Sequence, residues 1–162
     1  MNSQAALNIT LPPPDRLVGG QHWLETALGY AGIQGDTPLS KTLEIFCTLM
    51  QRGRQHQFAK ARDEACLHFV IALDFLFGEK GRSTDSVAER VAVLTHHSAT
   101  KSYTEQYSRI RSLYDARSKY VHEGTTIARI DAVDMERTAT QVLWSFLSVA
   151  ADGIHTTTDH WL

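Results

Sequence analysis

The chain has 162 residues, of which 43% are hydrophobic and 21% are charged, and its formal net charge is −2. These values are ordinary for a soluble globular protein with one core, and they exclude a molecule that attracts nucleic acid over its whole surface. No apolar run reaches the roughly 20 residues of a membrane span, and no basic and apolar leader opens the sequence. We therefore expect a cytoplasmic protein without membrane contact.

The cysteine and histidine patterns do not favour a metal site. Cys47 and Cys66 are not spaced as C-x-x-C and stand among apolar residues, so we predict reduced, buried thiols rather than a disulfide or a zinc knuckle. Four of the eight histidines lack the i, i+4 pairing or the nearby acidic residues of a zinc site on a helix. These four are His96, His97, His155 and His160. No metal and no cofactor are expected.

Residues 1–21 are predicted to be irregular, because they contain three consecutive prolines followed by two glycines. They could be a frayed terminus, a strap laid over the domain or the remnant of a linker. A short amphipathic helix is predicted from Trp23 to Ala31. Thr37 and Pro38 are typical of a second helix start, with a cap residue followed by proline in the first turn.

The sequence then predicts a turn at Gly53 and a long apolar helix over residues 55–77, with Phe58 on its core side. Apolar residues surround this helix from Leu67 onward, which is typical of a helix at the centre of a bundle. Asp74 lies within this stretch. It is either a buried carboxylate that needs a cation or a hydrogen-bond donor, or a hydrated group at the edge of the bundle.

No window of the sequence alternates as strands do, and no internal repeat is present. The remaining predicted elements are a turn over 78–83, a helix from Thr84 or Asp85 to about His97, a helix over 102–124 and a last helix over 131–151. We predict an all-α, single-domain, up-and-down helical bundle of about five to six helices. It would cover residues 22–152 and be followed by a tail over 153–162.

The helix over 102–124 has both a start and a stop signal. Ser102 and Glu105 fit a capping box, and Gly124 stands where a left-handed residue often closes a helix. One face is apolar, and its members are Tyr103, Tyr107, Ile110, Tyr114 and Val121. Arg117 falls on this same face, where a charge is unexpected. Its stem could snorkel along the core, it could pair with Asp74, or it could belong to a functional site.

A polar line runs beside the apolar face of the same helix. Arg111, Asp115, Ser118 and His122 follow at i, i+4, i+7 and i+11, so they stack along one side, and Arg117 borders them. Residues 101–122 carry five basic and two acidic side chains, a local charge of +3. A basic helix can hold a phosphate chain, although many helices carry such a bias without any ligand.

The stretch over 113–124, LYDARSKYVHEG, resembles the signature helix of the HEPN superfamily, in particular its Apea-like branch. Two upstream stretches agree with that family: ALDFLF over 72–77 and AERVAVL over 88–94. The resemblance covers roughly residues 38–150. Arginine followed by histidine recurs elsewhere in this chain, for example at Arg90 and His96, so the residues around Arg117 and His122 carry the specificity.

The resemblance implies a metal-independent endoribonuclease that acts on single-stranded RNA, in a toxin or antiphage setting and with a possible neutralising partner protein. It implies a homodimer in which Arg117 and His122 of the two copies share one cleft, with Ser118 beside the arginine. We add Asp115 as a group that could orient His122. Four further candidates come from the residue patterns. Asp74 and Tyr114 would support the arginine, and Arg111 and Lys119 would bind RNA phosphate.

The sequence also departs from the family pattern. The residue after the arginine is often asparagine in the nuclease branches and is Ser118 here, and the tyrosine that follows the histidine by two in some toxins is Gly124. Regulation through a modified tyrosine is therefore not supported. The family also contains non-catalytic members, so the alternative function is a module for RNA or nucleotide binding or for protein assembly.

Overall fold

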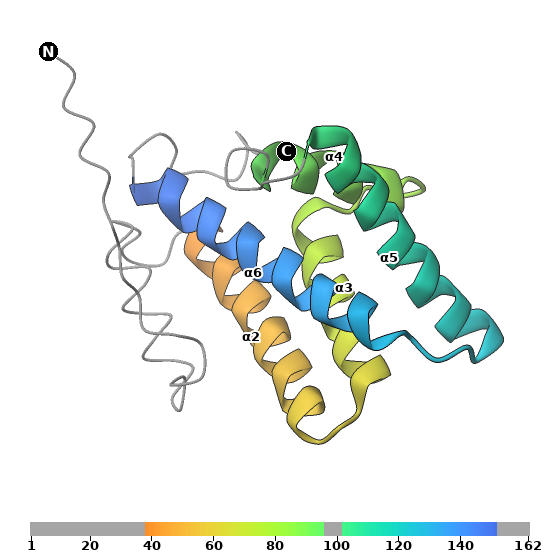
Figure 1. Ribbon diagram of the computed structural model, residues 1–162. Helices are drawn as coiled ribbons and strands as arrows, with labels where there is room; N and C mark the ends of the chain where they lie inside the picture. The colour runs from red at the N-terminus through yellow and green to blue at the C-terminus, as the bar shows by residue number, and fades with distance from the viewer. Residues whose placement is uncertain (1–37, 96–101, 152–162) are drawn as a thin grey trace, which may run out of the picture.

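The computed structural model describes residues 38–95 and 102–151, and these ranges form five α-helices and no strand (Figure 1). The helices are α2 (Pro38–Phe58), α3 (Arg62–Phe77), α4 (Ser83–Thr95), α5 (Tyr103–Glu123) and α6 (Arg129–Ala151). The prediction of an all-α, single-domain helical bundle is confirmed. The irregular segment and helix expected before residue 38, and the tail over 153–162, lie outside the described residues.

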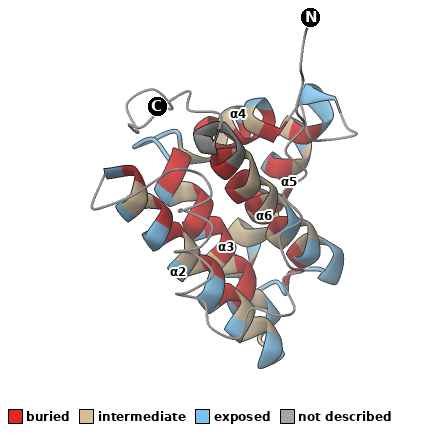
Figure 2. Ribbon diagram, turned by 90° about the vertical axis from the view of Figure 1, so that its left-hand side faces the viewer, coloured by how far each residue is buried: buried red, intermediate tan, exposed pale blue. Residues whose placement is uncertain are grey.

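Helix α3 is the centre of the bundle, since it packs against each of the other four described helices. Its sequence is apolar on nearly all sides, as expected for a helix with neighbours all round. Figure 2 shows buried residues on the sides of the helices that face one another. The buried side chains of α3 are Ala65, Cys66, Phe69, Val70, Ala72, Leu73, Leu76 and Phe77.

The boundary between α2 and α3 differs from the sequence prediction. Helix α2 continues through Gly53 and ends at Phe58, and the turn lies at residues 59–61, where Lys60 adopts a left-handed φ of 63°. Gly53 is buried against α3, and a Cβ at this position would lie 2.5 Å from the ring of Phe69. The glycine therefore marks a close helix contact and not a turn. Phe58, expected in the core, is 87% exposed.

Both predicted ends of α5 are confirmed. The Ser102 hydroxyl accepts a hydrogen bond from the Glu105 amide at 3.3 Å, and the Glu105 carboxylate accepts one from the Ser102 amide at 2.8 Å. At the other end Gly124 has a left-handed φ of 70°, and its amide donates to the carbonyl of Tyr120 at 3.1 Å. These contacts satisfy terminal backbone groups that a helix leaves unpaired.

Ion pairs and backbone contacts fix α5 against the rest of the bundle. Arg109 donates to Asp131 at 2.9 Å and to Asp134 at 2.7 Å, both on α6. Burial lowers the pKa of Arg109, but the hydrogen bonds and charges of the two carboxylates outweigh it, and the pKa rises. After α5, the amide of Ile127 donates to Asp63 of α3 at 2.7 Å.

No helix in the described ranges has the length and apolarity to cross a membrane.

The substitution Gly53→Ala should lower the free energy of unfolding by about 1–3 kcal/mol, the usual cost of overpacking a core. Alanine is favoured over glycine in a helix by about 1 kcal/mol, but the added Cβ would lie 2.5 Å from the ring of Phe69, which is fully buried. Urea unfolding measures the change. Gln55→Ala, at an exposed position of the same helix, is the control and should stay within about 0.5 kcal/mol of the parent.

The two thiols should be unreactive in the folded protein. Burial raises the pKa of Cys47 and of Cys66 from 9.0 to about 12, and at Cys66 the charges of Asp131 and Asp63 add to the effect. Because thiols in the unfolded chain ionise near pH 9, the stability that protonated thiols contribute is complete below that pH and is lost as the pH rises toward 12. At pH 8 we expect slow reaction with a disulfide reagent and fast reaction in urea. Equal rates would contradict this prediction.

Candidate functional site

Arg117 has an unmet capacity to bind an anion. It lies on α5 between Tyr114 and Val121, it is half-buried, and its Nε is enclosed by protein without a hydrogen-bond partner. No ion pair to Arg117 is found in residues 38–95 and 102–151. A buried donor without a partner costs about 1–3 kcal/mol, and more when it is charged. The fold thus holds a guanidinium in place without compensating it.

Asp74 does not pair with Arg117, which corrects one of the three alternatives considered for the arginine. Its carboxylate accepts a hydrogen bond from the Tyr114 hydroxyl at 2.9 Å and another from the Ser83 hydroxyl. Burial, followed by the charge of Asp74 and the hydrogen bond to it, raises the pKa of Tyr114. Tyr114, which precedes Arg117 by about one turn of α5, therefore binds the carboxylate that one of these alternatives assigned to the arginine.

Arg117 lies near the junction of α3 and α5. Its charge acts on the buried Cys66 of α3 as well as on Tyr114, in each case against a larger effect of burial. Both helices also carry exposed apolar side chains. On α3, Ile71 and Phe75 are each 44% exposed, and on α5 Val121, one turn after Arg117, is 48% exposed.

His122 is exposed in the last turn of α5, and no hydrogen bond joins it to another side chain of the described residues. The expected contact with Asp115 is absent, and Asp115 is itself exposed. Seven residues of a helix correspond to a rise of about 10 Å, which is too long for a direct hydrogen bond between these side chains. Ser118 is half-buried beside Arg117. The polar line is thus a row of separate groups and not a connected network.

Arg117 and His122 point in different directions from the same helix. They are five residues apart, which corresponds to about 140° around the helix axis. Lys119 is exposed and lies about 200° from Arg117, so it faces away from the arginine. One copy of α5 does not bring these three side chains together.

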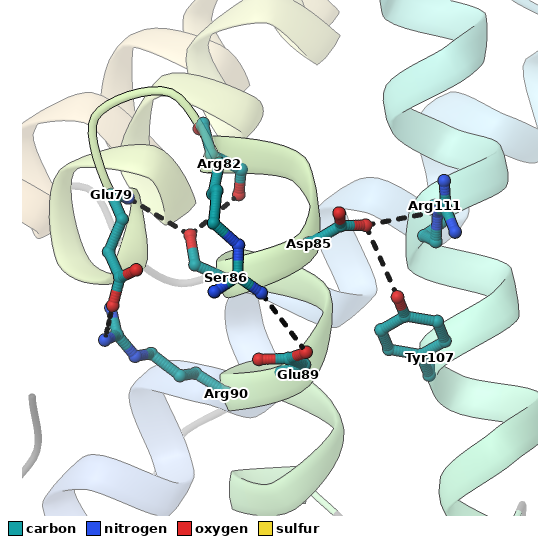
Figure 3. A network of polar contacts seen from close by, with 9 residues as sticks. Glu79, Arg82, Asp85, Ser86, Glu89, Arg90, Tyr107 and Arg111 are labelled. Atoms are coloured by element: carbon teal, nitrogen blue, oxygen red, sulfur yellow. Dashed lines mark hydrogen bonds and ion pairs between the residues drawn. The ribbon is translucent and has the colours of Figure 1, made fainter.

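Arg111 is held by α4 and does not extend freely into solvent. Its Nε lies 3.5 Å from Asp85 Oδ1, and the hydroxyl of Tyr107 donates to the same oxygen at 3.3 Å (Figure 3). The Arg111 guanidinium lies over the Tyr107 ring, 5.9 Å from the ring centroid. Its charge is therefore balanced within the molecule, which weakens the expectation that it binds a phosphate.

The turn before α4 supports this arrangement. Arg90 donates to the carbonyl of Phe77 at 2.8 Å. Arg90 also pairs with Glu79, and the Glu79 amide donates to the Ser86 hydroxyl at 3.1 Å (Figure 3). These contacts connect the end of α3 to the first turns of α4. They fix the positions of Ser83 and Asp85, the two residues of α4 that reach toward Asp74 and Arg111.

Sequence reasoning missed three residues of this region, namely Ser83, Asp85 and Tyr107. Tyr107 precedes Arg111 by four residues, so helical spacing alone could have indicated their contact. Ser83 and Asp85 meet their partners across helices, and no local pattern marks such contacts. In the part of the chain that the structure describes, no group of three or more histidine, cysteine or acidic side chains could hold a metal ion. The histidines at 96, 97, 155 and 160 lie outside that part.

Comparison of the chain with protein-family models, with curated proteins and with solved structures finds no match.

The substitution Arg117→Met should raise the free energy of unfolding by about 1–3 kcal/mol. Methionine keeps an unbranched stem of similar length and removes the enclosed donor that has no partner. If Arg117 formed an ion pair with Asp74, the same substitution would instead lower the free energy of unfolding, because it would leave the Asp74 carboxylate buried without a cation.

Arg109→Met is the matched control for this measurement, made on the same helix. It strands two carboxylates, Asp131 and Asp134, and should lower the free energy of unfolding by about 1–3 kcal/mol. Urea unfolding measures the free energy of unfolding of both variants, which should rise in Arg117→Met and fall in Arg109→Met. A loss of stability in Arg117→Met would contradict our description of the site.

Proposed function

We propose that this chain is a metal-independent endoribonuclease that cuts single-stranded RNA with Arg117 and His122. The observation that carries the proposal is the Arg117 guanidinium, held half-buried with an enclosed Nε and no anionic partner among the described residues. A phosphate group would supply that partner. The resemblance of residues 113–124 to the HEPN signature helix names the same two residues, and a toxin or antiphage role with a neutralising partner follows from that resemblance alone.

The chemistry needs only these two groups and the RNA itself. Cleavage through the neighbouring 2′-hydroxyl requires a proton acceptor or donor that works near pH 7, which an imidazole supplies. It also requires fixed positive charge beside the phosphorane, which a guanidinium supplies with two parallel hydrogen bonds. His122 is exposed and can reach solvent-borne RNA, whereas Arg117 is held by its buried stem. The expected product carries a cyclic phosphate end.

A homodimer is part of the proposal. On one helix the two side chains diverge by about 140°, so a site with both of them combines Arg117 of one copy with His122 of the other. Helices α3 and α5 expose the large apolar side chains Ile71, Phe75 and Val121, which the second copy would cover. Contiguous exposed apolar surface is typical of a face that meets a partner.

The purified protein should cleave single-stranded RNA in the presence of EDTA and leave cyclic-phosphate ends. His122→Ala and Arg117→Ala should each reduce the rate at least about 100-fold, the usual loss of a general acid–base or of a charge-stabilising group. Arg137→Ala, at an exposed arginine of α6, is the control and should retain most of the activity. Cleavage that survives both substitutions, or that requires a divalent metal, contradicts the mechanism.

The two inactive variants also test the shared cleft. A mixed dimer of Arg117→Ala and His122→Ala copies contains one complete site if the arginine and the histidine come from different copies. Mixing the variants under conditions that exchange subunits should then restore cleavage. A site built within one copy would stay inactive in the mixture.

A second candidate is a non-catalytic module that binds RNA or a nucleotide. The observation that favours it is the exposed His122, which no side chain of the described residues orients. Such a module would bind RNA with an affinity that falls as salt is added, and it would not cleave the RNA. The EDTA cleavage assay separates the two candidates.

A further inference from the structure

Three flat side chains follow one another along the exposed edge of α5. Tyr103, Tyr107 and Arg111 are spaced at i, i+4 and i+8, so they share one side of the helix. The rings of Tyr103 and Tyr107 lie nearly parallel, with 17° between their planes and 6.2 Å between their centroids. The Arg111 guanidinium continues the row, 5.9 Å from the Tyr107 centroid. We call these three residues the stacked row.

Asp85 fixes the end of the stacked row that lies nearest to Arg117. It accepts a hydrogen bond from the Tyr107 hydroxyl and pairs with Arg111 through the same oxygen (Figure 3). The pair balances the charge of Arg111, while the side chain remains 53% exposed. Such a group is poorly suited to bind a phosphate and well suited to offer a flat face, since guanidinium planes stack on aromatic rings and on nucleobases.

The stacked row lies on the same face of α5 as Ser118 and His122, whereas Arg117 lies about 120° away around the helix. One side of Arg111 lies over Tyr107, and the helix continues on the other side toward Ser118 and His122, which share its face at i+7 and i+11. The rise from Arg111 to Ser118 is about 10 Å and that to His122 about 16 Å. A base that rests on Arg111 would therefore leave the RNA backbone close to these residues.

We propose that Arg111, supported by Tyr107 and Asp85, is a stacking platform for a nucleobase of single-stranded RNA. The proposal rests on the RNA-binding part of the proposed function and replaces the phosphate contact that the sequence predicts for Arg111. Stacking on an aromatic or guanidinium plane tolerates any base, because every base has a π-face. The platform would thus hold the strand without selecting a sequence.

The test uses the full chain with His122→Ala, so that the RNA stays intact, and an oligouridylate that carries one 2-aminopurine. Binding of the probe should quench its fluorescence through stacking. Arg111→Lys keeps the charge and loses the plane, and it should weaken binding about fivefold or more and reduce the quenching. The salt dependence of binding should stay unchanged, because no phosphate contact is lost. Arg137→Lys, at an exposed arginine of α6, is the matched control and should bind like the parent.

A phosphate contact gives a different pattern and would overturn the proposal. In that case Arg111→Lys would bind like the parent, and Arg111→Ala would reduce the slope of log K against log salt by about 0.7. Absence of RNA binding, or Arg111-dependent binding of a protein instead of RNA, would also overturn it. The cleavage assay tests the nuclease separately from the binding that the platform predicts. An inactive wild type whose RNA binding still falls in Arg111→Lys would contradict the nuclease and leave the platform standing.

Discussion

The carboxylate of Asp74 is the point at which three helices of the bundle are joined. It belongs to α3, and it accepts hydrogen bonds from Tyr114 of α5 and Ser83 of α4. A partly buried carboxylate is costly unless donors surround it, and hydrogen bonds to a charged group are about twice as strong as neutral ones. The position of α5, which carries both Arg111 and Arg117, relative to α3 and α4 therefore depends on this group.

The same contact explains why Arg117 is left uncompensated. A carboxylate near an arginine usually pairs with it, and the pair would have satisfied both groups in the core. Here Tyr114 takes the carboxylate, and the arginine one turn later keeps an enclosed Nε without a partner. A buried donor without a partner is expected to lower stability by about 1–3 kcal/mol. The candidate site is thus a half-buried Arg117 beside an Asp74 carboxylate that is already hydrogen-bonded to Tyr114.

The features predicted correctly from the sequence are those that depend on residues close together in the chain. The cap at Ser102, the left-handed Gly124 and the central position of α3 all follow from local spacing and periodicity. Contacts between helices were not predictable in this way. The partner of Asp74 and the close approach of Gly53 to Phe69 depend on the angles and positions at which helices pack. Local sequence patterns do not predict that geometry. The expected Asp115–His122 contact was wrong. A spacing of seven residues puts both side chains on one face of the helix, but it also separates them by about 10 Å along the helix axis.

Helix α5 is capped at both ends and clamped to α6 by Arg109, which leaves it no freedom to shift in register. Insertion of one residue would rotate everything beyond it by about 100°. An insertion between Tyr107 and Tyr114 would separate the contact to Asp85 from the contact to Asp74. The number of residues from Ser102 to Gly124 is therefore constrained by these contacts. We expect natural relatives of this chain to differ in α5 by substitutions and not by insertions.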